Sequence, residues 1–434
     1  LRVLLRIDIV FRQLFFDKGF PSELDIPAGP GVGGRRRGGQ VAKFSTRFNM
    51  RRALAVVLGS KLAKGLGLAT TAGLTLALGA CESAPKGPVV LTPEERAAQV
   101  PAQAEAWNKL GYRVQWRGFA TLLPGETVAN FQALDDVLVT QGSMSGVTVT
   151  EVNSGQRRWS DQVGSPLIRF YAAQRDGKRL IVPSEAEVYF FDIETGSLVD
   201  KQSLAEVAST APAQAGDILV FGTTSNVVLG HNKRNGYRAW GVLMNAPTET
   251  APVMLADTGV VGMVSRRGDI AFANAATGTS VGRAQIFDGT TVPVASSESA
   301  MFIASRDFSL YGYSNEGTQL WRIRTEAELR WAPTYHDKRV YCDLGSDGLT
   351  CVDAATGKIV WNNAGVAGRV IAVSKGRLLT FDGSSATLVD PKDGSVVQRV
   401  LLDEVRFLVP DKFVDGTLYA VSSNGVISKL TLRP

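Results

Sequence analysis

Three cysteines are the residues of this 434-residue sequence whose chemistry depends most on their surroundings. Cys342 and Cys351 flank the turn at residues 344–349. Symmetric pairing of the flanking strands about Ser346 and Asp347 places the two cysteines opposite each other. Opposed residues of an antiparallel pair lie close enough for a disulfide when they form a non-hydrogen-bonded pair. We therefore predict a Cys342–Cys351 disulfide; the alternative is two buried thiols that fill small gaps.

Other side chains that commonly take part in catalysis form no recognisable motif. His231 and His336 are the only histidines, and neither has a matched partner for a metal site or a nucleophilic triad, so both are predicted to be loop or surface residues. No C-x-x-C or haem-attachment motif occurs. The sequence thus predicts no catalytic residue, no metal site and no cofactor. The paired carboxylates are interpreted as solvated strand ends, and they are Asp135, Asp136, Asp403 and Glu404.

Basic and aromatic residues offer a different kind of chemistry, the binding of another protein. Lys233 and Arg234 with Arg238 form a basic cluster that we expect on a solvated loop, with a protein-partner site as the alternative. Arginine and aromatic side chains dominate the binding energy of many protein interfaces. The candidate anchors on inter-strand loops are Arg234, Tyr237, Arg266, Arg267, Arg306 and Phe308.

The structural elements that position these residues are predicted most clearly by residues 351–361, CVDAATGKIVW, which have the pattern of a β-hairpin. Two apolar strand residues lead into Asp353, whose side chain can hydrogen-bond the turn backbone together with Thr356. Gly357 suits the turn because it takes φ > 0 without a Cβ clash. A second strand begins after the turn and carries Trp361, which has enough apolar surface to pack against a neighbouring unit.

This hairpin recurs through the chain with a period of roughly 40 residues. Four short strands per period are typical of a β-propeller blade, whereas a β-sandwich keeps no fixed period over so many copies. The fourth residue after the glycine is tryptophan in four copies, at Trp159, Trp240, Trp321 and Trp361. The turn glycines are Gly155, Gly196, Gly236, Gly278, Gly317, Gly357 and Gly394.

The two ends of the repeat region predict how the ring closes. Two strands follow the last turn glycine, with a turn at Asn424 and Gly425, and this final unit lacks its outer strand. Residues 111–116 read as an outer strand with no unit before it. Joining the two would seal both sheet edges and give eight blades of four antiparallel strands. Seven blades are the alternative.

The first 80 residues differ in composition from the rest. Residues 1–49 carry no repeat and are interpreted as a non-native upstream extension before Met50. Residues 50–80 have a basic start and an apolar stretch that ends in small residues before Cys81, as in a lipoprotein signal peptide. The alternative is a membrane anchor, for which the uncharged stretch 65–80 is short.

We therefore expect Cys81 to be lipidated. Residues 81–110 are expected to form a tether with a short helix, and residues 111–434 to form the propeller.

The N-terminal segments differ from the rest of the chain in net charge. The whole chain has a net charge of +6, but residues 1–80 hold 13 Lys and Arg against 4 Asp and Glu. The remainder keeps 34 of the 47 basic and 37 of the 41 acidic residues, a net charge of −3. The basic character of the chain is thus confined to segments we expect to be absent from the mature protein, and nucleic-acid binding loses its main support.

The repeat A-x-D-x-x-T-G-K-x-x-W resembles that of the pyrroloquinoline-quinone-like (PQQ-like) propellers, and residues 351–361 match it except for Cys351 in place of alanine. One branch of this superfamily, the quinoprotein dehydrogenases, is longer and uses a vicinal cysteine pair, a calcium site and an aspartate base. This sequence has no adjacent cysteines.

A second branch, the BamB-type outer-membrane β-barrel assembly lipoproteins, combines a signal peptide, a lipidated cysteine, a short tether and an eight-bladed ring. All four features have predicted counterparts here. The resemblance implies a non-enzymatic scaffold, lipid-anchored in the outer membrane and facing the periplasm. Its implied partner is a BamA-like barrel-inserting subunit. Glu82, where an aspartate would favour inner-membrane retention, agrees with this location. The alternatives are a quinone-dependent oxidoreductase, or a propeller lipoprotein that binds another envelope protein or a glycan.

Overall fold

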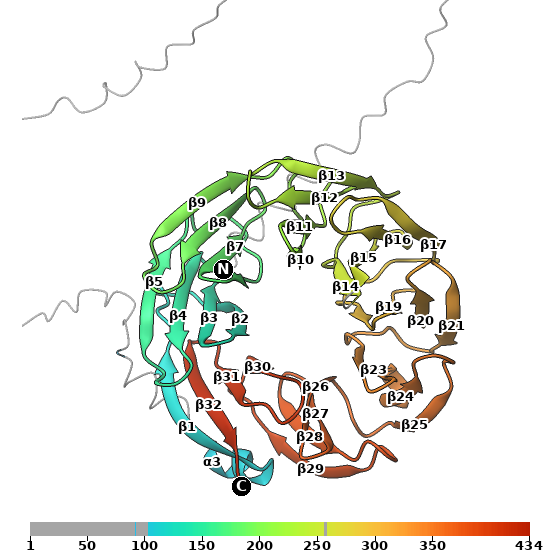
Figure 1. The fold of residues 1–434 in the computed structure, drawn as a ribbon. Coiled ribbons are helices and arrows are strands. Elements are labelled where there is room, and N and C mark those ends of the chain that lie inside the picture. Colours follow the sequence, from blue (N-terminus) through green and yellow to red (C-terminus); the bar gives the residue numbers. More distant parts are fainter. Residues whose placement is uncertain (1–91, 93–102, 256–257) are drawn as a thin grey trace, which may run out of the picture. The chain divides into compact units, whose positions relative to one another are not determined.

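The computed structural model describes residue 92 and residues 103–255 and 258–434. In this part of the chain, 32 strands form eight four-stranded antiparallel sheets. The sheets surround a central axis as the blades of a propeller (Figure 1). The predicted all-β, eight-bladed fold is confirmed, and the seven-bladed alternative is wrong. The proposed extension, the signal peptide, Cys81 and most of the tether lie outside the described residues.

Blades 1 to 4 each consist of four consecutive strands, which follow one another from the central axis to the rim. Blade 1 contains β2 (Val128–Leu134), β3 (Val137–Gly142), β4 (Gly146–Glu151) and β5 (Arg157–Gln162). Blade 2 contains β6 (Gln174–Asp176), β7 (Arg179–Pro183), β8 (Glu187–Asp192) and β9 (Leu198–Ser203). Blade 3 contains β10 (Ala213–Ala215), β11 (Ile218–Phe221), β12 (Val227–Asn232) and β13 (Arg238–Leu243). Blade 4 contains β14 (Val253–Leu255), β15 (Val260–Val264), β16 (Asp269–Asn274) and β17 (Ser280–Gln285).

Blades 5 to 7 follow the same order. Blade 5 contains β18 (Ala295–Ser296), β19 (Ala300–Ser305), β20 (Ser309–Ser314) and β21 (Gln319–Arg324). Blade 6 contains β22 (Thr334–His336), β23 (Arg339–Asp343), β24 (Leu349–Asp353) and β25 (Ile359–Asn363), with the 3-10 turn η2 (Gly345–Asp347) between its second and third strands. Blade 7 contains β26 (Arg369–Ser374), β27 (Arg377–Phe381), β28 (Ser385–Val389) and β29 (Val396–Leu401).

Blade 8 joins the two ends of the described chain. Its inner strands are β30 (Phe407–Pro410), β31 (Leu418–Val421) and β32 (Val426–Leu432), and its outer strand is β1 (Tyr112–Phe119). β1 pairs antiparallel with β32 from Tyr112 opposite Leu432 to Phe119 opposite Val426. The predicted closure by an N-terminal strand is confirmed, and it leaves no open edge between the first and last blades.

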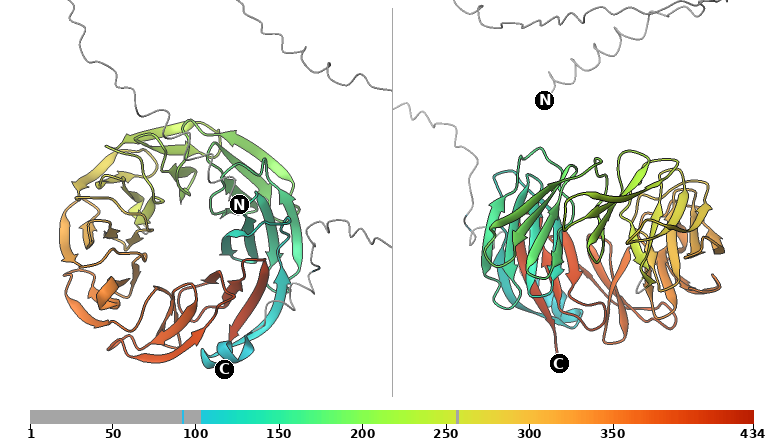
Figure 2. Two further views of the ribbon diagram at one scale, coloured as in Figure 1. Left: turned by 180° about the vertical axis from the view of Figure 1, so that it is seen from behind. Right: turned by 45° about the horizontal axis from the view of Figure 1, so that its top comes forward.

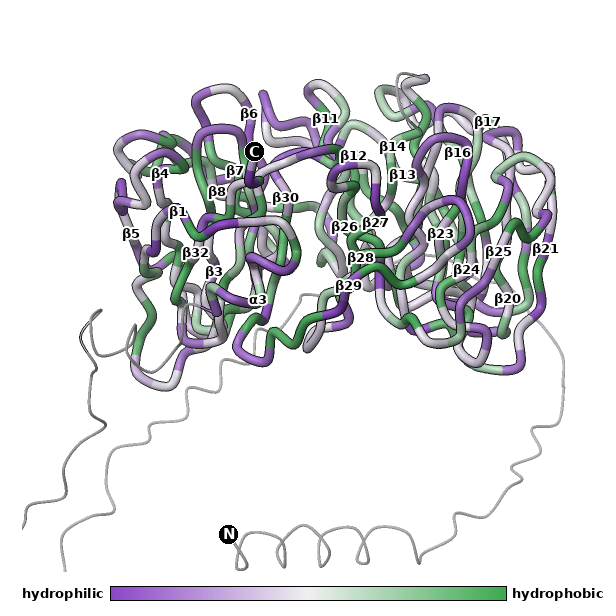
Figure 3. The backbone as a smooth tube through the Cα atoms, turned by 90° about the horizontal axis from the view of Figure 1, so that it is seen from below, coloured by the Kyte–Doolittle hydropathy of each residue, from purple (hydrophilic) through white to green (hydrophobic). Residues whose placement is uncertain are grey.

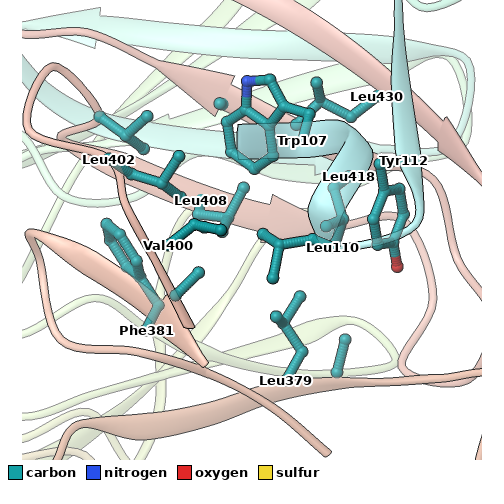
Figure 4. Packing of buried hydrophobic residues seen from close by; sticks show 14 of the residues in the cluster. Trp107, Leu110, Tyr112, Leu379, Phe381, Val400, Leu402, Leu408, Leu418 and Leu430 are labelled. Atoms are coloured by element: carbon teal, nitrogen blue, oxygen red, sulfur yellow. The ribbon is translucent and has the colours of Figure 1, made fainter. Parts of the chain in front are cut away.

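Helix α3 (Ala104–Lys109) precedes the closing strand and packs at the junction of blades 7 and 8. Trp107 and Leu110 are buried against Val400 and Leu402 at the end of blade 7 and Leu418 and Leu430 of blade 8 (Figure 4). The expected short helix is therefore part of the propeller body.

The hydrophobic core is divided among the gaps between blades, which we call seams. Each of the eight apolar clusters draws its residues from two neighbouring blades. Because a middle strand lies between two seams, both of its faces are buried, as in β3 and β19. Such strands read as continuous apolar runs. The outer strands alternate instead, as in β13.

All seven turn glycines adopt positive φ, from 72° at Gly278 and Gly357 to 86° at Gly317. In the turn of blade 6, the Asp353 carboxylate accepts hydrogen bonds from the Thr356 backbone N–H and hydroxyl, at 3.1 and 2.8 Å. The repeat residues thus form the turn that the sequence predicts.

Tryptophan fills five of the eight seams. Each indole lies against the turn glycine of the next blade and donates its Nε1–H to the carbonyl three residues before that glycine. Trp321, for example, packs on Gly357 and donates to the Ala354 carbonyl at 2.8 Å. The other four donors are Trp116, Trp159, Trp240 and Trp361.

The strand order gives the ring two different ends. One end carries the turns between first and second and between third and fourth strands, including the turn glycines; we call it the glycine-turn face. The other end carries the turns between second and third strands and the connections from blade to blade; we call it the connector face. Figure 2 shows loops at both ends, and Figure 3 shows hydrophilic residues at many of these turns, with hydrophobic residues mainly along the strands.

Candidate docking face

The structure brings no metal-binding constellation together among the residues that it describes. No group of three His, Cys, Asp or Glu side chains there is arranged to hold a metal ion. His231 lies on β12 in blade 3 and His336 on β22 in blade 6. No helix within the described ranges is long and apolar enough to cross a membrane.

The predicted Cys342–Cys351 disulfide is wrong. Both thiols are free and buried, and Cys342 pairs with Thr350 while Cys351 pairs with Tyr341. The hairpin centre thus lies at Ser346, half a residue before the assumed position. This shift changes the pairing by one residue, and side chains alternate between the two faces of a strand, so the two cysteines lie on opposite faces of the sheet. Cys342 therefore packs between blades 5 and 6, and Cys351 between blades 6 and 7.

The two cysteines are instead the buried thiols of the alternative prediction. Burial raises the pKa of the Cys351 thiol to about 11 and raises that of Cys342 still further. Thiols with such raised pKa values stay protonated and are poor nucleophiles.

Two residues expected at the surface are buried at the seam between blades 2 and 3. His231 is fully buried, and Lys233 is 4 % exposed with its ammonium group 2.8 Å from Asp176. The Gln202 amide donates to the Lys233 carbonyl at 3.0 Å, in the place that an indole takes elsewhere, and its oxygen lies 2.8 Å from His231 Nε2. Burial lowers the pKa of His231, which favours the neutral ring. These residues form a polar seam.

The paired carboxylates differ in their surroundings. Asp403 and Glu404 are exposed, as expected of solvated strand ends. Asp135 is also largely exposed and lies 3.5 Å from Arg175, whereas the half-buried Asp136 forms ion pairs with both Arg158 and Arg175. Asp136 is therefore part of a network between blades 1 and 2.

The six candidate anchors lie on both faces of the ring. Arg234 and Tyr237 are on the glycine-turn face of blade 3, where Arg234 pairs with Asp217 at 2.8 Å and Tyr237 is 73 % exposed. The remaining four lie on the connector face, in the second-to-third-strand turns of blades 4 and 5, and they are Arg266, Arg267, Arg306 and Phe308.

Arg306 holds the loops of the connector face together at this place. Its guanidinium lies 3.4 Å from Glu249 in the connection from blade 3 to blade 4 and 2.6 Å from Asp288 in the next connection. It also donates to the backbone carbonyl of Arg266 at 2.8 Å. Arg266 itself lies 3.4 Å from Glu249. Four loops are thus fixed in position before any partner binds.

Aromatic rings project from these loops into solvent. Phe287 is 90 % exposed and Phe308 is 46 % exposed. Phe308 also has φ of +59°, a conformation rare for a bulky side chain, at the last position of the turn between β19 and β20. Arg267 lies in the neighbouring turn, exposed and without an acidic partner among the described residues. Phe287, Phe308, Arg266, Arg267 and Arg306 together form what we call the blade 4–5 patch.

A cavity of about 360 Å³ adjoins this patch on the connector face of blades 5 and 6. Trp331 and Arg330 line it together with the buried carboxylate of Asp343. The Thr325 backbone N–H donates to the Phe308 carbonyl at 2.8 Å, so the connection that lines the cavity begins beside the patch. Exposed aromatic and arginine side chains next to a cavity are typical of the anchoring part of a protein interface.

Comparison with known families is consistent with this arrangement. The sequence profile of the family described as outer membrane protein assembly factor BamB matches residues 143–291 and 266–433, which together exceed half of the chain. The chain belongs to the BamB family. The predicted resemblance to PQQ-like propellers of the BamB type is confirmed.

Solved structures show the same fold at low sequence identity. The crystal structure of BamB from Moraxella catarrhalis shares 16 % identity and a TM-score of 0.56, over 73 % of this chain and 98 % of that chain. The computationally designed Ika8 protein shares 14 % identity and a TM-score of 0.59, over 70 % of this chain and 96 % of that chain. A search of curated proteins gave no match.

Sequence reasoning missed two residues of this region of the BamB-family chain, Phe287 and Trp331. Both lie in connections between blades, where the 40-residue pattern gives no expectation for the exposure of a side chain. At Phe287 the sequence does contain a usable signal. The phenylalanine directly precedes Asp288 and Gly289, a dipeptide typical of turns, which indicates that its ring lies on a loop.

Proposed function

We propose that this chain is a non-enzymatic scaffold that assists the assembly of outer-membrane β-barrel proteins by binding a BamA-like barrel-inserting subunit. Membership of the BamB family supports this role. A propeller holds its loops on rigid stacked blades, which suits binding to another protein.

The blade 4–5 patch is the surface that we assign to the partner. Its loops are fixed by the ion pairs and hydrogen bonds of Arg306, so little ordering is needed on binding. Phe287 and Phe308 provide apolar anchors, and Arg267 provides a charge that can pair with an acidic residue of the partner. This pre-formed combination of exposed rings and arginines is the observation that carries the proposal.

We further propose that the scaffold is a lipoprotein of the outer membrane that faces the periplasm. The signal-like segment 50–80 and Cys81 support this location. Two acyl chains on Cys81 would anchor the chain stably, whereas one would not. Replacing Cys81 by serine should release the protein into the soluble periplasmic fraction, and retention of an unprocessed form in the membrane would contradict the lipid anchor.

Crosslinking of two matched double variants tests the partner and the face together. Phe287→Ala with Arg267→Glu removes an aromatic ring and reverses a charge in the patch. Tyr237→Ala with Arg234→Glu makes the same changes on the glycine-turn face. We expect the first variant to lose at least about tenfold in recovery of the BamA-like subunit, and the second to keep it, because interface energy is concentrated in a few anchors.

The possible outcomes distinguish an error in the assembly role from an error in the choice of docking face. Loss of recovery only in the glycine-turn variant would show that the partner binds the other face. Absence of any barrel-assembly subunit among the crosslinks of the unchanged chain, with normal levels of outer-membrane barrels after deletion of the gene, would reject the assembly role.

A further inference from the structure

A second cavity lies on the connector face between blades 1 and 2, three blades away from the blade 4–5 patch. Its volume is about 410 Å³, within the range of small-ligand sites. β2, the second-to-third-strand turn of blade 1 and the connection from blade 1 to blade 2 contribute its walls. The lining residues that matter here are Asn130, Ser145, Ile168, Arg169, Phe170 and Tyr171.

Tyr171 makes the back of the cavity rigid. Its hydroxyl donates to the Ala208 carbonyl at 2.9 Å, and its backbone N–H donates to the Pro183 carbonyl at 2.8 Å. Its own carbonyl accepts from the Gln141 side chain at 2.9 Å. The residue is thus held by blade 1, by blade 2 and by the connection to blade 3.

Arg169 supplies a positive charge at the cavity. Its guanidinium carbon lies 5.4 Å from the centre of the Tyr171 ring, a cation–π distance. The side chain is exposed and forms no ion pair within the described part of the chain. Glu185 is nearby, because its backbone N–H donates to the Arg169 carbonyl at 3.1 Å, but its carboxylate does not pair with the guanidinium. The charge is therefore positioned by Tyr171 and available to a ligand.

Asn130 adds a polar group without a partner. It lies at a β-bulge, where the pairing of β2 with β3 shifts between Val128 and Asn130. Bulges commonly re-aim a side chain beside a functional site. The Asn130 side chain makes no hydrogen bond to a described residue, although it is partly buried. The adjacent turn contains Ser145 at φ of +72°, which is uncommon for a residue with a side chain.

Part of the wall is apolar. Ile168, Phe170, Ala172 and Ala211 line the cavity, and Leu167, directly before Ile168, is 93 % exposed. A planar guanidinium matches a carboxylate with two parallel hydrogen bonds, and an amide can donate a third. An apolar wall beside these groups favours a ligand in which the acid is attached to a hydrophobic part.

We propose that this cavity binds an organic carboxylate attached to an apolar or aromatic group, with Arg169 and Asn130 on the carboxylate and Phe170 and Ile168 along the apolar part. Such chemistry has two sources, a free amphipathic acid and the C-terminus of a polypeptide. The site does not depend on the partner assigned to the blade 4–5 patch.

Calorimetric titration of the purified full chain tests the proposal with defined probes. N-acetylphenylalanine should bind at least about tenfold more tightly than its uncharged amide, because the amide loses the charge-assisted hydrogen bonds. Arg169→Gln should weaken binding of the acid by a similar factor and leave binding of the amide unchanged. Arg406→Gln is the matched control, since Arg406 is also exposed and stacked on a ring, that of Phe407 at 5.5 Å, but in blade 8.

Equal binding of acid and amide, or an equal loss in the Arg169 and Arg406 variants, would overturn the carboxylate site. An unchanged unfolding temperature of Arg169→Gln confirms that any loss is local. An octapeptide ending in phenylalanine, with a free or an amidated C-terminus, identifies the source. Binding of only the free-ended peptide supports a polypeptide C-terminus, and failure of both, with N-acetylphenylalanine bound, supports a small acid.

Discussion

Two neighbouring seams of the ring are built in opposite ways. Between blades 5 and 6, Trp321 fills the gap against Gly357 and donates to the Ala354 carbonyl. Between blades 4 and 5, the equivalent position is Gly282, and a Cβ there would lie 2.2 Å from the carbonyl carbon of Glu316. At this position of the repeat, the first seam is closed by a side chain, and the second by direct approach of backbone to backbone.

The two kinds of seam also differ in where aromatic rings are exposed. In the tryptophan seams the large rings are mostly buried, whereas over the seam between blades 4 and 5 the rings of Phe287 and Phe308 are exposed. On the connector face that seam is held by polar contacts of Arg306. The seam itself buries Phe272, Tyr311 and Tyr313, so the proposed docking surface lies at its connector end, where two further aromatic rings are exposed.

The junction of blades 7 and 8 has no tryptophan of the repeat, and α3 with β1 closes it. Deleting residues 82–118 removes Trp107, Leu110 and Tyr112 and leaves the outer edge of β32 unpaired. We expect aggregation or loss of cooperative unfolding, because an open edge invites pairing with other chains. Light scattering and urea unfolding followed by circular dichroism measure this effect, the largest that we predict. A stable monomeric truncation would contradict the closure.

A tryptophan seam is the next most sensitive element. Trp321→Ala should destabilise the protein by about 3–5 kcal/mol, since it removes a large buried ring and leaves a cavity. Trp321→Phe should cost less, because it keeps part of the packing and loses the hydrogen bond to Ala354. Urea unfolding with an unchanged m-value measures both. Equal effects of the two variants would show that the hydrogen bond, and not packing, holds the seam.

Much of the fold could be predicted from the sequence because the repeat acts locally. A turn that needs positive φ requires glycine at Gly357, and a strand that faces the next blade favours tryptophan at Trp361. These requirements recur every 40 residues or so, and they define blades whatever their neighbours contain. The pairing of β1 with β32 followed from the missing outer strand at the C-terminal end.

The polar seam could not be predicted, because its contacts join distant residues. Gln202 and His231 are 29 positions apart, and Lys233 meets Asp176 from another blade. Nothing in the local sequence distinguishes a buried lysine with such a partner from a solvated one. The error at Cys342 had another cause, because the composition of the turn does not determine whether the hairpin is centred on Ser346 or half a residue later.

The backbone seam between blades 4 and 5 should resist even one added methyl group. Gly282→Ala places a Cβ 2.2 Å from backbone that cannot move freely, so we expect a loss of about 1–3 kcal/mol. Gly365→Ala is the matched control, because a Cβ there meets only the Asn363 side chain at 3.2 Å. Thermal unfolding compares the two variants. A loss confined to Gly365→Ala would show that the seam between blades 4 and 5 has room to relax.

The smallest predicted effect concerns an ion-pair network that joins blades 1 and 2 beside their tryptophan seam. Asp136 pairs with Arg158 at 2.7 Å and with Arg175 of β6. Arg158 in turn reaches Glu194 of blade 2 at 3.0 Å. The hydrogen bond from Arg175 lowers the pKa of Asp136 to about 2. Because Asp136 is partly exposed, solvent screening limits the contribution of its ion pairs to roughly 1 kcal/mol or less.

The pKa shift fixes the pH dependence of this contribution. An unfolded aspartate has a pKa of about 3.9, so the folded state gains stability above that pH and loses it as the pH falls towards 2. Asp136→Asn should therefore be less stable than the unchanged protein at pH 7, and the difference should shrink between pH 4 and pH 2.5. Asp135→Asn, at a more exposed carboxylate 3.5 Å from Arg175, is the control, and it should change stability at pH 7 less than Asp136→Asn does. Urea unfolding at pH 7, 4 and 2.5 measures the differences; a constant loss for Asp136→Asn would mean that Asp136 acts through packing and not through its charge.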